Sequence, residues 1–169
     1  KIMKTILLCG CNGKMGQVIT HCVKERTDCR IAAGIDISGA SQDDYPVVTS
    51  LEQLDWDADV MIDFSHPSAL NALLDYALKH KTPAVLCTTG YSPEQVQSIH
   101  EASKRIPVFY SGNMSLGINL LIALAKTAAS VLGDGFDVEI IEKHHNQKID
   151  APSGTALMIA DAVSECMAR

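Results

Sequence analysis

The chain has 169 residues, of which 47 % are hydrophobic, and its 14 Lys and Arg against 20 Asp and Glu give a net charge of -6. This length and composition allow one globular domain, or one domain and part of another. The acidic balance, without a charged tail, argues against nucleic acid as a partner. An anionic ligand would have to be bound locally, by a few cations and by helix N-termini.

The cysteines and the N-terminus predict a cytoplasmic protein. The six cysteines show no Cys-x-x-Cys spacing and several stand in apolar runs, which indicates small buried side chains in a reducing compartment. Cys9 and Cys11 have no further ligand at metal-binding spacing, so we expect no metal. The first residues predict a strand rather than a signal peptide, and we expect no run long enough to span a membrane.

Short apolar runs alternate with amphipathic stretches through the first two thirds of the chain. Buried strands are predicted at residues 4–10, 29–36, 58–65, 83–90 and 106–112, with a short strand at Val47 and Val48. Helical spacing predicts one apolar face made of Met15, Val18, Ile19, Cys22 and Val23. It predicts a second face made of Leu70, Leu73, Leu74, Ala77 and Leu78. A third helix is expected at 92–105, with Ser92 as its cap and Pro93 in its first turn.

This alternation predicts an α/β fold with a doubly wound parallel sheet and helices on both faces. An antiparallel α+β domain fits less well, because the strands are apolar throughout and do not alternate.

The last third of the chain follows a different pattern. Residues 115–133 predict a helix that is apolar nearly all round; Lys126 interrupts it, which favours burial between layers or against another subunit over a membrane. Residues 136–145 alternate as a half-exposed strand does, and 154–169 predict a helix. One strand and one helix cannot close a core, so we expect a first domain at 1–114 and, at 115–169, the truncated beginning of a second.

The turn after the first strand has the sequence GCNGKMG, with Gly10, Gly13 and Gly16. Glycines between a buried strand and a helix let the backbone approach a pyrophosphate. Asp36 ends the second strand roughly 20 residues after the last glycine, where a carboxylate can accept hydrogen bonds from an adenosine ribose. The spacing therefore predicts a Rossmann-type dinucleotide site, against the alternative of a tight turn beside an ordinary surface Asp.

The residues around Asp36 favour NADH over NADPH. The carboxylate would repel a 2′-phosphate, and Ile37 and Ser38 supply no arginine to receive it. Lys14 in the glycine turn could reach that phosphate and keep NADPH usable. We expect NADH to serve at least as well as NADPH.

Three other predicted strands end in polar or glycine-rich loops: DFSHP at 63–67, CTTG at 87–90 and SGNMS at 111–115. The carboxyl ends of parallel strands meet at one edge of the sheet, so these loops should lie at the edge that carries the glycine turn. We expect a cofactor cleft there.

The stretch EKHHNQKIDAPSGTA, residues 142–156, concentrates titratable groups in an otherwise aliphatic chain. His144 and Lys148 share parity along an extended chain and His145 points the other way, which makes His144 and Lys148 the expected proton-handling pair. The turn at 152–153 leads into a helix whose first amides, at Gly154 and Thr155, could hold a carboxylate. The alternative is a capped helix after a solvated basic turn.

This stretch resembles the signature E-x-H-H-x-x-K-x-D-A-P-S-G-T-A of the 4-hydroxy-tetrahydrodipicolinate reductase (dihydrodipicolinate reductase) family. GCNGKMG, DFS, TTG and GNMSLG resemble the other blocks of that family in the right order, and the likeness covers the whole chain. The resemblance implies NAD(P)H-dependent reduction of a cyclic unsaturated dicarboxylate in lysine and diaminopimelate biosynthesis. It also implies a homotetramer, with a dinucleotide-binding domain at 1–114 and part of a substrate-binding and oligomerisation domain at 115–169.

The resemblance also implies roles for individual residues. His144 and Lys148 would be catalytic, and His145, Gly154 and Thr155 would bind substrate. The cofactor would be bound by Gly10, Cys11, Asn12, Gly13, Lys14, Met15, Asp36, Cys87, Thr88, Thr89, Ser111, Gly112, Asn113 and Met114.

Two departures from the family pattern bear on these roles. Family members commonly have Gly where this chain has Cys87, and family chains continue well past Arg169. A nucleotide-binding module without turnover is therefore an alternative; a different dehydrogenase would have no reason to keep KIDAPSGTA.

Overall fold

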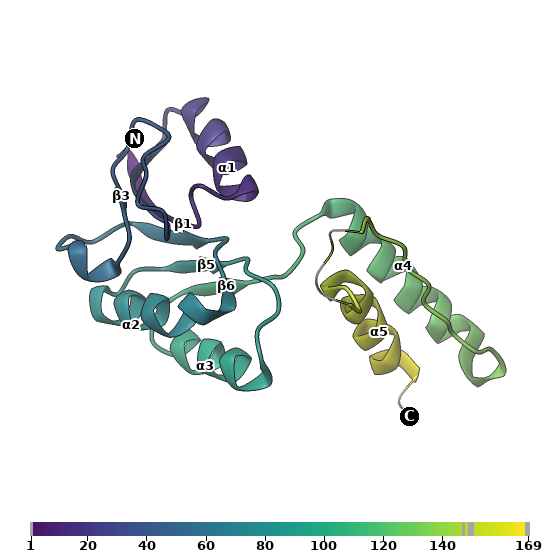
Figure 1. The fold of residues 1–169 in the computed structure, drawn as a ribbon. Helices are drawn as coiled ribbons and strands as arrows, with labels where there is room; N and C mark the ends of the chain where they lie inside the picture. The colour runs from purple at the N-terminus through teal and green to yellow at the C-terminus, as the bar shows by residue number, and fades with distance from the viewer. Residues whose placement is uncertain (1, 147, 149–150, 168–169) are drawn as a thin grey trace. The chain divides into compact units, whose positions relative to one another are not determined.

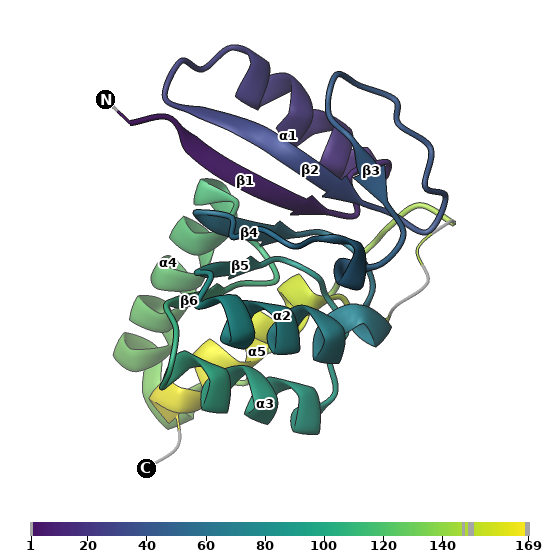
Figure 2. The same cartoon turned by 90° about the vertical axis from the view of Figure 1, so that its left-hand side faces the viewer.

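The computed structural model describes residues 2–146, 148 and 151–167. Its chain divides into two compact units, residues 1–111 and 112–169. Within the described part of the first unit, the sheet has six strands in the order β3-β2-β1-β4-β5-β6, and every neighbouring pair is parallel (Figures 1 and 2). The strands are β1 (Lys4–Cys9), β2 (Cys29–Ile35), β3 (Val47–Val48), β4 (Val60–Asp63), β5 (Ala84–Leu86) and β6 (Val108–Tyr110).

Helices cover both faces of this sheet. Helix α1 (Lys14–Lys24) lies on one face, whereas α2 (Leu70–His80) and α3 (Pro93–Ser103) lie on the other (Figures 1 and 2). Short 3-10 turns at Leu51–Gln53 and Pro67–Ala69 precede β4 and α2. The predicted doubly wound parallel sheet is confirmed, and its strand order is the one found in Rossmann-type proteins.

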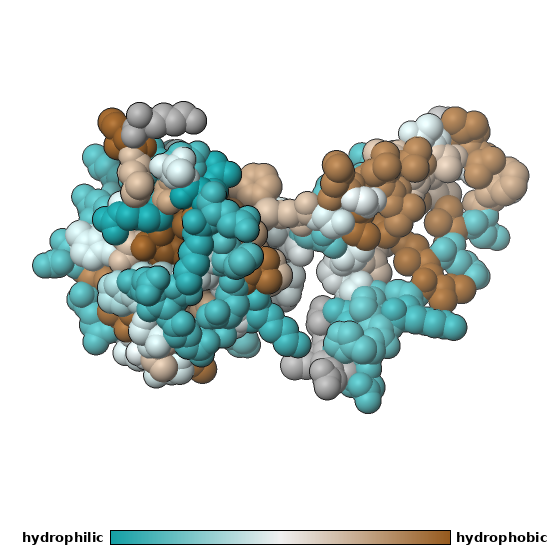
Figure 3. All heavy atoms as spheres, turned by 90° about the horizontal axis from the view of Figure 1, so that it is seen from above, coloured by the Kyte–Doolittle hydropathy of each residue, from teal (hydrophilic) through white to brown (hydrophobic). Residues whose placement is uncertain are grey.

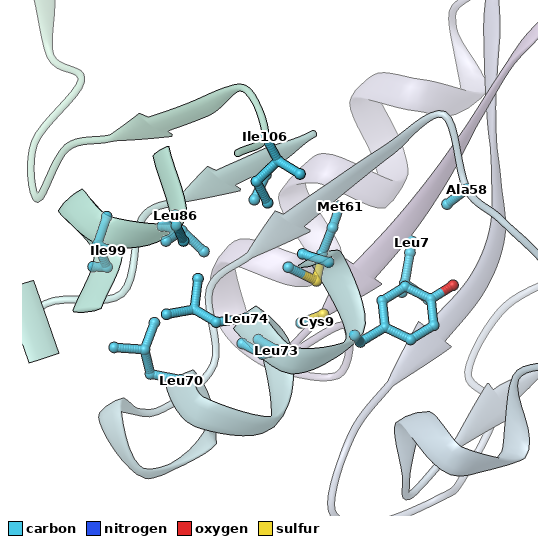
Figure 4. Close-up of a cluster of buried hydrophobic side chains, with 14 of the residues drawn as sticks. Leu7, Cys9, Ala58, Met61, Leu70, Leu73, Leu74, Leu86, Ile99 and Ile106 are labelled. Atoms are coloured by element: carbon cyan, nitrogen blue, oxygen red, sulfur yellow. The ribbon is translucent and has the colours of Figure 1, made fainter. Parts of the chain in front are cut away.

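Alternate residues of β1 supply two hydrophobic cores, because successive side chains of a strand point to opposite faces. Leu7 and Cys9 are buried in the larger core, against α2 and α3. Ile6 and Leu8 are buried in the smaller core, against α1. Figure 4 shows the larger core, in which strand residues meet Leu70, Leu73, Leu74, Ile99 and Ile106.

The cap of α3 forms as predicted. Ser92 Oγ accepts a hydrogen bond from the backbone N–H of Gln95, and the Gln95 side chain accepts one from the backbone N–H of Ser92. Pro93 occupies the first turn, where its missing N–H costs no hydrogen bond. This capping box fixes the point at which the loop after β5 becomes a helix.

The predicted buried face of α1 is only partly right. Ile19 and Val23 pack against the smaller core, but Met15 and Val18 are about half exposed, and Cys22 is exposed too. The helix turns Gly16 and Thr20 inward instead: Gly16 lies against the glycine turn, and the Thr20 hydroxyl shares a 2.7 Å hydrogen bond with Tyr45 Oη. Buried polar partners therefore set the orientation of this helix as much as apolar spacing does.

The second unit contains helices α4 (Leu116–Leu132) and α5 (Gly154–Met167), which pack against each other. A 3-10 turn, Gly133–Gly135, follows α4. Ala129 of α4 and Val163 of α5 are buried, and Lys126 forms a 3.1 Å ion pair with Glu165. Much of the remaining surface of α4 is exposed and apolar, and hydrophobic side chains gather on this unit in Figure 3.

Two expectations about α4 have different outcomes. Among the described residues of this chain only Ala129 of α4 is buried, so burial of the helix between layers is not seen, whereas burial against another subunit stays a prediction. The segment Leu116–Gly135 is also long and apolar enough, with a mean hydropathy of 1.6, to cross a membrane by length and composition alone. The ion pair at its middle, between Lys126 and Glu165, speaks against that arrangement, because charged groups are costly in a bilayer core.

The strand predicted at 136–145 is wrong for this structure. These residues form no strand, and among the described residues of the second unit no strand is present to pair with them. A β-strand is stabilised by its hydrogen-bonded neighbours, so an alternating pattern alone does not form one. The predicted helix at 154–169 is confirmed as α5 over residues 154–167, and residues 168–169 lie outside the described part.

Candidate functional site

The glycine turn is shaped by close backbone contacts. A Cβ on Gly16 would lie 2.3 Å from the backbone oxygen of Gly10, and a Cβ on Gly10 would lie 2.5 Å from that of Phe64. Gly10 has a φ of +75°, which favours glycine. The Gln17 side chain donates a 3.1 Å hydrogen bond to the backbone oxygen of Cys11 and holds the turn in place.

Helix α1 begins directly after this turn, with Gly13 as its N-cap. Glycine has no side chain to cap the helix, and no side chain bonds to the first-turn amides as a cap. These amides carry the positive end of the helix dipole and suit an anion. Lys14 and Met15 are exposed and accessible to a ligand.

Asp36 lies immediately after β2 and is already tied to the glycine turn. Its Oδ2 accepts a 3.2 Å hydrogen bond from the backbone N–H of Asn12, and its Oδ1 accepts bonds from the backbone N–H and the hydroxyl of Ser38. The side-chain amide of Asn12 donates to Ser38 Oγ and to the backbone oxygen of Ala40, both over 2.8 Å. A carboxylate has about four acceptor positions, so Asp36 retains capacity for a ribose hydroxyl.

Asp63 is a residue to which the sequence analysis gave no role. It ends β4, is fully buried, and accepts four hydrogen bonds. Ser65 donates from its amide and its hydroxyl, Thr88 from its hydroxyl over 2.7 Å, and Tyr91 from its phenol over 3.1 Å. Asp63 thereby joins the loops that follow β4 and β5. A carboxylate within the apolar run VMIDF was the available signal, because Asp is rarely buried without partners.

The predicted cofactor residues in the loop after β5 differ in burial and in hydrogen bonding. Thr88 is buried and its hydroxyl is bonded to Asp63, so its side chain supports the loop, whereas Thr89 is exposed. Burial and the nearby charge of Asp63 raise the pKa of the Cys87 thiol to about 12. Cys87 is therefore an inert thiol whose backbone N–H is bonded to the Asp63 carbonyl.

Ser111 ends the first unit, and its backbone N–H bonds to the Leu86 carbonyl over 3.1 Å. The other residues predicted at this point, Gly112 and Met114, are exposed and belong to the second unit.

A dinucleotide fits the residues of the first unit. The tight Gly10 to Gly16 turn lets backbone approach a phosphate, the first turn of α1 lacks a side-chain cap, and a carboxylate stands at the end of β2.

The second unit brings two other predicted residues together. The Asn113 side-chain amide donates a 2.8 Å hydrogen bond to Thr155 Oγ1, and Asn113 Oδ1 accepts a bond from the backbone N–H of Ser115. Asn113 thus links the start of α4 to the first turn of α5. A residue predicted for the cofactor and one predicted for the substrate share one polar contact.

Glu142 is the second residue that the sequence analysis left without a role. Its carboxylate accepts hydrogen bonds from the amide of Ser153 and from the Ser153 hydroxyl. His144 lies beside it, with Nδ1 3.6 Å from Glu142 Oε2. The hydrogen bonds from Ser153, with smaller contributions from the charges of His144 and Lys148, lower the pKa of Glu142.

The parity argument for His144 and Lys148 fails, although both residues lie near Glu142. The backbone N–H of Lys148 bonds to the carbonyl of His145 over 3.2 Å, which closes a turn. The chain is therefore not extended through Lys148. Gly154 begins α5 as expected, whereas Gln147, Ile149 and Asp150 of the signature stretch lie outside the described residues.

The strand order, the glycine turn and the carboxylate after β2 define a Rossmann-type α/β protein with the features of a dinucleotide-binding domain. Two family models match the chain: Dihydrodipicolinate reductase, N-terminus, over residues 4–114, and Dihydrodipicolinate reductase, C-terminus, over residues 117–169. The chain belongs to the dihydrodipicolinate reductase family.

Among similar curated proteins, the 4-hydroxy-tetrahydrodipicolinate reductase of Clostridium tetani is 51 % identical over 97 % of this chain and 64 % of its own length. The protein of the same name from Caldanaerobacter subterraneus is 51 % identical over 98 % of this chain and 65 % of its own length. The chain thus spans less than two thirds of the length of these relatives.

One solved structure with the family's name matches the chain. A dipicolinate-bound dihydrodipicolinate reductase from Paenisporosarcina sp. TG-14 matches with a TM-score of 0.77 and 30 % identity, over 98 % of this chain and 67 % of that one. A myo-inositol dehydrogenase from Corynebacterium glutamicum matches with a TM-score of 0.58 and 18 % identity, over 79 % of this chain and 43 % of that one. The second likeness concerns the fold alone.

Proposed function

We propose that the full-length protein reduces 4-hydroxy-tetrahydrodipicolinate to tetrahydrodipicolinate with NAD(P)H, in lysine and diaminopimelate biosynthesis. The observation that carries this proposal is the 51 % identity, over 97 % of the chain, to a relative of that name. The glycine turn and the basic stretch at 142–156 supply the residue types that the reaction requires.

The cofactor would be bound by the first unit and the residues that follow it. The amides of Gly10 to Met15 and the first turn of α1 suit the pyrophosphate, and Asp36 suits the adenosine ribose. Thr88 would act through its backbone, because its hydroxyl is bonded to Asp63. The nicotinamide side would be completed by Cys87, Thr89, Ser111, Gly112, Asn113 and Met114.

NADH is the cofactor that the residues near Asp36 favour. The Asp36 carboxylate would repel a 2′-phosphate, and Ile37 is 98 % exposed and carries no charge to attract one. Lys14, in the glycine turn, is exposed and can interact with a phosphate, so NADPH would remain usable.

His144 and Lys148 would handle protons. The reduced nicotinamide, when bound, supplies the hydride. Once the 4-hydroxyl of the substrate has left as water, the hydride adds to the conjugated cyclic imine; His144 would give a proton to the resulting substrate enamine, and Lys148 would be a second donor. His145 and the Gly154 and Thr155 amides at the start of α5 would bind a substrate carboxylate. These cations and amides would allow an acidic protein to bind a dianion locally.

For the full-length protein we also propose a cytoplasmic location and a homo-oligomer, a tetramer by family resemblance, with no nucleic acid or membrane partner. The exposed apolar residues of the second unit support association, because large apolar patches usually mark interfaces. We expect sedimentation analysis of the full-length protein to give an oligomer, and a monomer would contradict the proposed association.

The direct test is NADH oxidation by the full-length protein, with the product of dihydrodipicolinate synthase generated in the same cuvette. The proposal expects oxidation that requires the synthase and its substrates. NADH binding without oxidation would instead identify a nucleotide-binding module.

A further inference from the structure

Glu142 occupies a central place in the basic segment of the second unit. Its two carboxylate oxygens bind both donors of Ser153, the backbone N–H at 2.8 Å and the hydroxyl. Two donors from one residue fix the plane of a carboxylate better than one does. The orientation of the Glu142 carboxylate is therefore fixed, although the residue lies on an exposed segment without secondary structure.

Ser153 connects Glu142 to the first turn of α5. Ser153 is 4 % exposed, and its hydroxyl also accepts a 3.1 Å hydrogen bond from the backbone N–H of Ala156. Its carbonyl accepts a 3.0 Å bond from the backbone N–H of Leu157. Glu142 is thus connected, through one serine, to the helix start that contains Gly154 and Thr155.

The His144 ring lies beside the same carboxylate. Its Nδ1 lies 3.6 Å from Glu142 Oε2, within ion-pair range but longer than a hydrogen bond. The Glu142 pKa is lowered, chiefly by Ser153, so the carboxylate is ionised at neutral pH. His144 and Lys148 also contribute to this lowering by their charges.

We propose that Glu142 is a positioning residue that orients the His144 imidazole through Nδ1 and couples it to the Ser153 turn, leaving Nε2 to exchange the proton. This inference rests on the proposed function of His144. A carboxylate beside Nδ1 favours the tautomer with a proton on that nitrogen. The acid and the turn that binds the substrate carboxylate would then keep a constant spacing.

A purely structural role for Glu142, as an anchor of Ser153, makes different predictions. Glu142→Gln removes the charge but keeps a carbonyl oxygen that can accept from Ser153. Ser153→Ala removes the hydroxyl contact but keeps the charge beside His144. Glu139→Gln, on the same exposed segment, removes one negative charge without touching either group and serves as the control.

The experiment measures kcat/KM and the ¹⁵N NMR shifts of the His144 ring, which report its tautomer, in the full-length protein, with His144→Gln used for assignment. For Glu142→Gln we expect kcat/KM to fall about tenfold or more, an unchanged KM for NADH, and a loss of the preference for the tautomer with a proton on Nδ1, because the ring has lost its partner charge.

Ser153→Ala should leave the tautomer of His144 in place and raise the KM of the dicarboxylate, and Glu139→Gln should change neither. If Glu142→Gln leaves the tautomer of His144 as it is in the unsubstituted protein, the inference is overturned. Absence of turnover in the unsubstituted protein would refute the proposed function instead, and the NMR shifts would still test the contact.

Discussion

The hydroxyl of Thr88 donates a 2.7 Å hydrogen bond to Oδ2 of Asp63, and both side chains are buried. This bond joins the loop that follows β5 to the end of β4. The two loops are part of the predicted cofactor edge, so a buried polar contact sets their spacing before any ligand binds.

Replacement of this hydroxyl should destabilise the first unit. Thr88→Val keeps the shape of the side chain but leaves Asp63 without one of its four donors, and we expect a loss of about 1–3 kcal/mol in the free energy of unfolding. Urea denaturation measures it. Thr89→Val, at the adjacent exposed position, is the matched control. Equal stability of the two variants would show that the Asp63 contact contributes nothing.

The glycine turn predicts a contrast between two of its glycines. A Cβ on Gly16 would meet backbone oxygens of Gly10 and Cys11 at 2.3 and 2.5 Å, whereas a Cβ on Gly13 would meet the Gly10 oxygen at 3.3 Å. We expect Gly16→Ala to cost more than about 1 kcal/mol, because backbone cannot move aside cheaply, and Gly13→Ala to cost less. Thermal unfolding of both variants tests this order, and its reversal would contradict the geometry.

The role of Asp36 can be tested by its effect on cofactor choice. Asp36→Ala removes the acceptor for the ribose hydroxyls and the charge that repels a 2′-phosphate, so NADH should weaken relative to NADPH by about tenfold. Ser38→Ala is the control, since it removes an internal partner of Asp36 and keeps the carboxylate. Fluorescence titration with both nucleotides gives the ratio, and an unchanged ratio in Asp36→Ala would rule out this role.

Asp59 predicts a pH-dependent contribution to stability. Lys4, at 2.8 Å, and the amide and hydroxyl of Thr5 lower the pKa of Asp59 to about 2, against about 3.9 in an unfolded chain. Because the folded-state pKa is the lower one, the stabilisation is present above the unfolded value and is lost as pH falls toward 2.

The free energy of unfolding of Asp59→Asn should therefore lie below that of the unsubstituted protein at pH 7, and the two should converge near pH 2. Asp55→Asn, at an exposed position nearby, should show a smaller difference at pH 7. A difference between Asp59→Asn and the unsubstituted protein that is as large at pH 2 as at pH 7 would exclude the assigned contacts.

The sequence predicts the sheet of the first unit well because its signals are local. Continuous apolar runs give the strands, and Ser92 and Pro93 give the start of α3. The failure at α1 has a tertiary cause: the inward position of Thr20 depends on Tyr45, 25 residues away. The failure at 136–145 has the same kind of cause, since a strand needs a partner that local alternation does not provide.

The sequence predicts the part of the candidate site whose geometry is set within one short motif, as in the glycine turn. It does not predict the side chains that act on a residue far away in the sequence. Asp63 acts on Thr88, 25 residues away, and Glu142 acts on Ser153, 11 residues away. Both carboxylates stand in stretches that the sequence analysis singled out, yet their roles appear only when the chain is folded.

The central claim is that His144 and Lys148 carry out proton transfer for a reduction by bound NADH. The most direct measurement is kcat of His144→Gln and Lys148→Ala in the full-length protein, with NADH affinity measured in parallel. We predict that kcat falls at least about 100-fold while NADH binds as before. Undiminished turnover in both variants would contradict the account.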